Sequence, residues 1–76
     1  MLIELKVPGS VVDATILVWH KRPDDRVEMG ESVLDVETAK GAVEVEAPQG
    51  GTIKEILKQQ GEVISSDDAV CTIETS

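Results

Sequence analysis

The second half of the chain resembles the first at an offset of 37 residues, and this internal repeat constrains the fold more than any other feature. Residues of the same type recur at matched positions along both halves: Thr15-Ile16 with Thr52-Ile53, Lys21 with Lys58, Val33 with Val70, and Glu37-Thr38 with Glu74-Thr75. Asp25 and Glu62 occupy equivalent turns, and Val27 and Val63 follow them with a one-residue slip. A repeat indicates an architecture of equivalent units, so we predict a fold with quasi-two-fold symmetry.

A strand-like alternation lies at the middle of the chain. Apolar Val43, Val45 and Ala47 alternate with Glu44 and Glu46, which is the period of a strand with one buried face. A valine-rich run, Val33-Leu34-Asp35-Val36-Glu37, comes just before, and a few small residues separate the two runs. The pattern predicts a β-hairpin whose tip presents Lys40 to solvent.

Strand-like segments account for most of the 76 residues. The chain is rich in Val, Ile, Leu and Ala, with one Trp and no Phe or Tyr, and branched aliphatic side chains suit strands. We expect a single all-β domain over residues 1–76, a flattened sandwich or barrel of two small antiparallel sheets (a barrel-sandwich hybrid), without helices. By symmetry, the Lys40 turn should lie at the opposite end from the chain termini. The predicted strands are Leu2-Val7, Thr15-Trp19, Arg26-Val27, Val33-Glu37, Ala42-Glu46, Thr52-Leu57, Glu62-Ile64 and Val70-Glu74.

The bulk composition excludes several classes of function. Fifteen acids against seven bases give a net charge of −8, which disfavours nucleic acid as a partner and favours a soluble monomer. No segment approaches the ~20 apolar residues of a membrane span. The single cysteine and the absence of a secretory signal predict a reducing compartment, the cytoplasm or the mitochondrial matrix of a eukaryote.

No motif for catalysis or metal binding stands out. Cys71 has no Cys/His partners at zinc-site spacing, and its alternating surroundings predict an inert residue of the last strand. His20 lacks a nucleophile placed by any motif, and Trp19 is expected in or beside the core. We therefore predict no catalytic residue and no metal site.

The hairpin segment carries a family resemblance. Glu37-Thr38-Ala39-Lys40-Gly41 with Val43-Glu44-Val45 and Ala47-Pro48 resembles the lipoyl-attachment motif of 2-oxo acid dehydrogenase acyltransferases. The similarity extends along the chain through three further segments: Leu5-Lys6-Val7-Pro8, Val18 to Val27, and Pro48 to Ile56. The sequence departs from the family pattern at Ala39, where an acidic residue is usual, at Gly41, and at Asp24, where a turn glycine is typical.

The resemblance implies a non-catalytic carrier whose Lys40 bears lipoate in amide linkage. Glu37, Ala39, Gly41 and Glu44 would support recognition by the lipoate-protein ligase or lipoyl transferase. The lipoylated Lys40 side chain would act as a swinging arm that visits a thiamine-dependent decarboxylase and the flavoprotein dihydrolipoamide dehydrogenase. Loop 9–12 would contact the decarboxylase. For Glu37 and Glu44 a plainly solvated strand face remains an alternative. Whether the chain is part of a dihydrolipoamide acyltransferase stays open.

Two rival functions share the fold. A biotin carrier of a carboxylase has the same hairpin lysine, but methionines normally flank it, whereas Ala39 and Gly41 do so here. An unmodified assembly module would not need Lys40 at all. Modification of Lys40 separates the three hypotheses.

Overall fold

Strands account for every regular element in the described part of the chain. The computed structural model describes residues 1–7, 13–65 and 67–75, and these contain no helix. The absence of helix leaves no helical segment able to cross a membrane in those ranges. Every expected strand is present, with ends within a residue of the prediction: β1 (Leu2–Lys6), β2 (Ala14–Trp19), β3 (Arg26–Val27), β4 (Ser32–Thr38), β5 (Gly41–Glu46), β6 (Gly51–Ile56), β7 (Val63–Ile64) and β8 (Ala69–Thr75).

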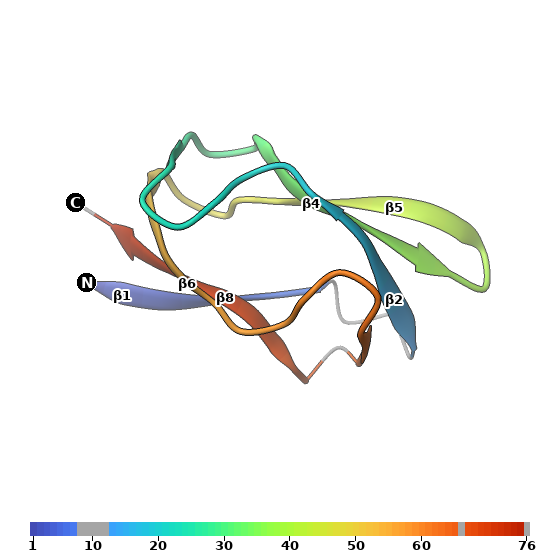
Figure 1. Ribbon diagram of the computed structural model, residues 1–76. Coiled ribbons are helices and arrows are strands. Elements are labelled where there is room, and N and C mark those ends of the chain that lie inside the picture. The colour runs from blue at the N-terminus through green and yellow to red at the C-terminus, as the bar shows by residue number, and fades with distance from the viewer. Residues whose placement is uncertain (8–12, 66, 76) are drawn as a thin grey trace.

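The strands form two open antiparallel sheets that pack face to face (Figure 1). Sheet A has the order β1-β8-β6-β3, and sheet B has the order β5-β4-β2-β7. Each sheet therefore takes two strands from each half of the sequence, so neither half can complete a sheet alone. The flattened sandwich predicted from the repeat is confirmed, and the two halves are interleaved within it.

A core of aliphatic side chains and one cysteine fills the space between the sheets, with the half-buried Trp19 packed against it. Buried and exposed residues alternate along β5, whereas register shifts in β4 and β8 place two adjacent residues in the core, Val33 with Leu34 and Val70 with Cys71. Val45 and Ala47 are buried while Glu44 and Glu46 are exposed, so the predicted alternation of β5 is confirmed. The buried residues are Leu5, Val7, Ala14, Ile16, Val27, Val33, Leu34, Val36, Val45, Ala47, Ile53, Ile64, Val70, Cys71 and Ile73.

Backbone hydrogen bonds confirm the quasi-two-fold symmetry at an offset of 37 residues. The Ile16 N–H donates to the Glu62 carbonyl at 3.0 Å, and the equivalent Ile53 N–H donates to the Asp25 carbonyl at 2.9 Å. The turns also match in conformation, since Asp24 has φ 75° and Gly61 has φ 91°. Asp24 thus adopts the left-handed conformation that the usual turn glycine would supply, which aspartate tolerates better than most residues.

The one-residue slip expected between Val27 and Val63 is wrong. Val27 and Ile64 are both buried and lie 37 residues apart, so Ile64 is the true counterpart of Val27. Val63 is 66% exposed and corresponds instead to Arg26. Strands β3 and β7 have two residues each, too few for alternation to show which residue faces inward.

The termini and the β4–β5 turn lie at opposite ends of an elongated molecule of 35 × 20 × 18 Å (Figure 1). At the terminal end, the Thr75 N–H and the Thr75 hydroxyl both donate to the Met1 carbonyl, at 2.8 and 3.0 Å. The Met1 ammonium group lies 3.2 Å from a Glu74 carboxylate oxygen. The predicted separation of tip and termini is confirmed.

Candidate functional site

The β4–β5 hairpin ends in a two-residue loop formed by Ala39 and Lys40. Thr38 pairs with Gly41 in the strand register, which leaves only these two residues between the strands. Neither has a positive φ, whereas Gly41 has φ 116°. In a two-residue hairpin loop, positive φ angles at the central residues normally match the twist of the two strands. Where the central residues lack them, the next residue must adopt an unusual conformation to restore that twist, and glycine adopts it with the least steric strain. Gly41 is therefore a requirement of this turn.

Thr38 holds the turn through its hydroxyl group. Its Oγ1 accepts a hydrogen bond from the Lys40 N–H at 3.1 Å and donates one to the Gly41 carbonyl at 2.9 Å. The two bonds fix the backbone on both sides of the lysine. Thr38 was not among the predicted site residues, although a threonine two residues before a turn position is a known side-chain turn signal.

Lys40 is exposed at the tip, as the sequence predicts. None of the ion pairs formed by the described residues involves Lys40, so its amine carries no carboxylate partner there. A primary amine on an exposed four-carbon stem at the end of a hairpin is accessible to an acylating enzyme.

The other residues predicted to support recognition lie on the same hairpin. Ala39 and Gly41 adjoin Lys40 and are exposed. Glu37 is exposed and pairs with Ala42 in the strand register. Glu44 is also exposed and pairs with Asp35, which places it two residues further from the tip along the strand. The hairpin thus brings all four predicted residues to one end of sheet B. Loop 9–12, expected to contact the decarboxylase, lies outside the described residues.

His20 and Trp19 have structural partners at the far end of β2. The His20 Nε2 lies 3.1 Å from Oδ1 of Asp35, with both side chains about a third exposed (37% and 28%). The half-buried Trp19 indole donates from Nε1 to the Lys58 carbonyl at 3.0 Å. No side-chain hydrogen bond of the described residues joins this imidazole to a hydroxyl or thiol group.

Cys71 is buried in β8, as predicted, and burial raises the pKa of its thiol to about 12. A thiol with that pKa stays protonated near neutral pH and is a poor nucleophile and metal ligand. Within the described ranges, no group of three or more His, Cys, Asp or Glu side chains is placed to hold a metal ion.

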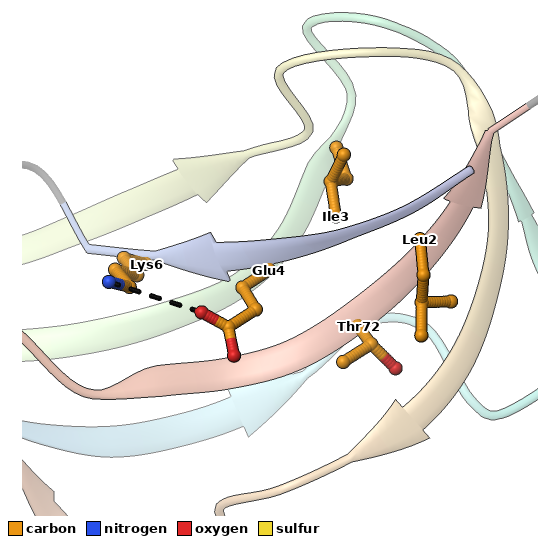
Figure 2. A pocket seen from close by; sticks show the side chains of 5 residues that line it. All are labelled: Leu2, Ile3, Glu4, Lys6 and Thr72. Atoms are coloured by element: carbon orange, nitrogen blue, oxygen red, sulfur yellow. Dashed lines mark ion pairs between the residues drawn. The ribbon is translucent and has the colours of Figure 1, made fainter.

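A shallow hollow lies on sheet A, the sheet that does not carry Lys40 (Figure 2). Figure 2 shows that its lining comes from β1 and from Thr72 of β8. The charged members, Glu4 and Lys6, form a loose ion pair at 4.0 Å, and the remaining lining residues are Leu2 and Ile3. The two charged groups of the hollow face each other in this exposed ion pair, whereas the hairpin tip presents an amine outside the ion pairs of the described residues and is therefore the candidate site.

Comparison with known proteins assigns the chain to a family. The biotin/lipoyl family model, described as "Biotin-requiring enzyme", matches residues 3–73. The dihydrolipoyllysine-residue succinyltransferase components of the 2-oxoglutarate dehydrogenase complexes of Pseudomonas aeruginosa and Bacillus subtilis are each 39% identical to it, over 90% and 95% of this chain. The chain spans only 17% and 18% of the length of these two relatives.

Two solved structures share the fold. The solution structure of the lipoyl domain of the Azotobacter vinelandii 2-oxoglutarate dehydrogenase complex superposes with a TM-score of 0.76 at 35% identity, over 97% of this chain and 99% of that one. Urea carboxylase from Kluyveromyces lactis superposes with a TM-score of 0.84 over 97% of this chain and 6% of that one, but at 23% identity this likeness concerns the fold alone. The chain therefore belongs to the biotin/lipoyl attachment family, among its lipoyl domains.

Proposed function

We propose that Lys40 is the covalent attachment site of a lipoyl group and that the chain is the swinging-arm carrier of a 2-oxo acid dehydrogenase complex. The observation that carries the attachment site is the position of Lys40 in a two-residue turn, exposed and outside every ion pair of the described residues. The similarity to lipoyl domains and to succinyltransferase components supports lipoate over biotin.

The roles of the chain's own residues follow from this geometry. The Lys40 Nζ, as a free amine, attacks an activated lipoyl carboxyl group, loses a proton and forms an amide as the activating group departs. Thr38 and Gly41 hold the backbone that presents the amine, while Glu37, Ala39 and Glu44 form the surface beside it. When bound, the lipoyl dithiolane supplies the chemistry of acyl and electron transfer, and the protein supplies position and recognition.

The relatives suggest where the carrier acts. Both succinyltransferase components are named for the 2-oxoglutarate dehydrogenase complex, so we propose that complex as the first candidate. The partners would be a ligase or transferase that attaches lipoate, a thiamine-dependent decarboxylase, and dihydrolipoamide dehydrogenase. The domain itself would act as a monomer on a tether in a reducing compartment. Tethering would raise its effective concentration at each active site to about the millimolar range for short flexible linkers.

The intact mass of the protein, expressed with lipoate, biotin and both ligases, tests the proposal. We expect a lipoyl increment that peptide fragmentation maps to Lys40. A biotin increment would assign the chain to the carboxylases, and the absence of any adduct would favour an unmodified assembly module.

The Lys40→Arg variant is the matched control. Arginine keeps the positive charge at the tip but cannot form the amide, so we expect a folded protein without an adduct. A turn-tip side chain contributes little packing, and the unfolding midpoint should stay at the wild-type value. An adduct that persists in this variant would place the attachment site elsewhere.

A further inference from the structure

A row of four outward-facing residues crosses sheet B directly behind the hairpin tip. The strand registers join them in the order Ala42 of β5, Glu37 of β4, Thr15 of β2 and Val63 of β7. Residues paired across neighbouring strands share one face of a sheet, and three of the four are exposed while Thr15 is half-buried. We call this set the tip row. It starts two residues after Lys40 and leads across the sheet to the opposite edge.

The tip row ends in an exposed apolar side chain. Val63 is 66% exposed on the edge strand β7, where an apolar residue is a liability because it favours unwanted association. The equivalent row of sheet A consists of Leu2, Glu74, Thr52 and Arg26. Its two central positions match those of the tip row, a glutamate beside a threonine, but its edge position carries a charge. The fold therefore accepts a charged side chain there, and the exposed valine points to a contact that the fold itself does not make.

The tip row lies within reach of a group attached to Lys40. At about 3.3 Å per residue along a strand and about 4.8 Å between strands, Thr15 lies about 12 Å and Val63 about 16 Å from the Lys40 Cα atom. The extended lysine side chain and lipoyl chain place a dithiolane ring about 14 to 16 Å from the same atom, by ordinary bond lengths. The ring can therefore cover Thr15 and contact Val63. The equivalent row of sheet A lies at the other end of the molecule, beside the termini (Figure 1).

The chemistry of a lipoyl arm fits these residues. The amide bond removes the charge of Lys40, and the arm beyond it is an uncharged hydrocarbon chain that ends in a sulfur-containing ring. Such a chain is stabilised when it covers an apolar surface, and the methyl groups of Thr15 and Val63 offer one. Because the arm is tethered to the same molecule, its effective concentration at the row is about millimolar, so even a weak contact is populated.

We propose that the tip row is a resting site for the lipoyl arm, in which the dithiolane ring lies against Thr15 and Val63. This inference rests on the proposed function. The carrier then has two states, one with the arm docked on its own sheet and one with the arm free to enter the active site of a partner. Only the free state exposes the disulfide fully, so the resting site slows reduction of the oxidised arm by small thiols.

Methyl NMR spectra of the chain test the contact directly. The chain lipoylated at Lys40 is compared with the chain acetylated at Lys40, which has the same amide and the same loss of charge but lacks the long arm. We expect the methyl signals of Val63 and Thr15 to differ between the two forms and to show nuclear Overhauser effects to the dithiolane protons. The methyl signals of Leu2, in the row of sheet A, should coincide.

The rate of dithiolane reduction gives a second measurement. Val63→Gln removes the apolar contact without a change of net charge, at a position where sheet A already carries a polar residue. Leu2→Gln is the matched control, because Leu2 is 56% exposed and lies in the equivalent row. If the arm is docked about two-thirds of the time, only the remaining third reacts with dithiothreitol, so Val63→Gln should accelerate reduction about threefold. Leu2→Gln should keep the wild-type rate.

The outcomes separate the resting site from the carrier function. Coincident methyl spectra of the lipoylated and acetylated forms, or equal reduction rates for Val63→Gln and the wild type, would overturn the resting site while leaving lipoylation of Lys40 intact. Equal acceleration by Leu2→Gln would overturn it as well. A wild-type protein that acquires no lipoyl group would overturn the carrier function and the resting site with it. If Val63→Gln does not fold, the wild-type spectra decide.

Discussion

A single hydroxyl group determines how the lysine is held at the tip. Thr38 bonds to the Lys40 N–H and to the Gly41 carbonyl. Its counterpart, Thr75, makes the same kind of bond from Oγ1 to the Met1 carbonyl at the other end of the molecule. Because the bond recurs where there is no lysine, it belongs to the fold, and the hairpin end uses it to orient a reactive residue.

Loss of this hydroxyl should slow modification of Lys40. Thr38→Val keeps the shape of the side chain but removes both bonds, and each bond is worth about 1 kcal/mol, so we expect lipoylation to slow by about five- to thirtyfold. Thr38→Ser restores the hydroxyl and should restore the rate. Initial rates of adduct formation by mass spectrometry measure the effect, and a serine variant as slow as the valine variant would argue against it.

Glu31 links stability to pH. A hydrogen bond from Lys21, at 2.7 Å, and one from the Glu28 N–H hold the pKa of Glu31 below its ordinary value of 4.5. A carboxyl with a lowered folded pKa contributes stability above its unfolded pKa, and this contribution is lost as the pH falls through the folded value.

The wild-type protein should therefore be more stable than Glu31→Gln at pH 7, and the difference should disappear as the pH falls below about 4.5. Urea midpoints at pH 7 and pH 3, followed by Trp19 fluorescence, measure it. Glu28→Gln is the control, because its carboxylate lies only within 4.0 Å of Arg26 in an exposed pair. A pH-independent difference for Glu31→Gln would contradict the assignment.

The strands were predictable from sequence because each long one places branched aliphatic side chains on its inner face, and β5 alternates them strictly with glutamates. The β4–β5 hairpin and the position of Lys40 followed directly from such runs. The phase of β7 did not, because Val63 and Ile64 are both apolar and the strand has only two residues. The hydrogen bonds of Thr38 and the hydrogen bond from Trp19 to Lys58 could not be predicted either. They depend on backbone geometry, which the alternation of apolar and polar residues does not specify.

Gly51 shows a steric requirement that the sequence pattern alone does not reveal. A Cβ atom at Gly51 would lie 2.3 Å from the Glu74 carbonyl oxygen and 2.9 Å from Cγ2 of Ile73, although the equivalent residue of the first half is Ala14. Strand β6 therefore approaches β8 more closely than a side chain allows.

Gly51→Ala should destabilise the protein by about 1–3 kcal/mol, the usual cost of forcing an extra carbon into a packed site. Gly50→Ala is the control, since its Cβ would approach no atom closer than 3.5 Å. Urea unfolding monitored by Trp19 fluorescence gives both values. Equal urea midpoints for the two variants would show that β6 can move away from β8 without loss of stability.

The whole molecule interleaves its two halves, so its stability should be cooperative. The sequence repeat predicted two equivalent units, but it could not show that each sheet takes strands from both. Pairing between strands that are far apart in the sequence produces no local sequence pattern, whereas the alternation of residues within one strand does.

Cys71 provides a probe of this cooperativity. Its thiol is fully buried and its pKa is about 12, so we expect no alkylation of the native protein by iodoacetamide at pH 8. In urea the thiol becomes exposed and its pKa returns toward the ordinary value near 8.5, so labelling should be rapid. Labelling should follow the Trp19 fluorescence transition, and reaction well below the urea midpoint would reveal separate opening of sheet A.

The bond between Met1 and Thr75 places the start and the end of the described chain on neighbouring strands, away from the tip. Chain ends that lie this close together have about the spacing of the two ends of an ordinary surface loop. The unit could therefore be spliced into a loop of an unrelated host protein without spreading the host's own strands. Lys40 would then project about the full 35 Å length of the molecule from the host, as a pendant handle for site-specific acylation.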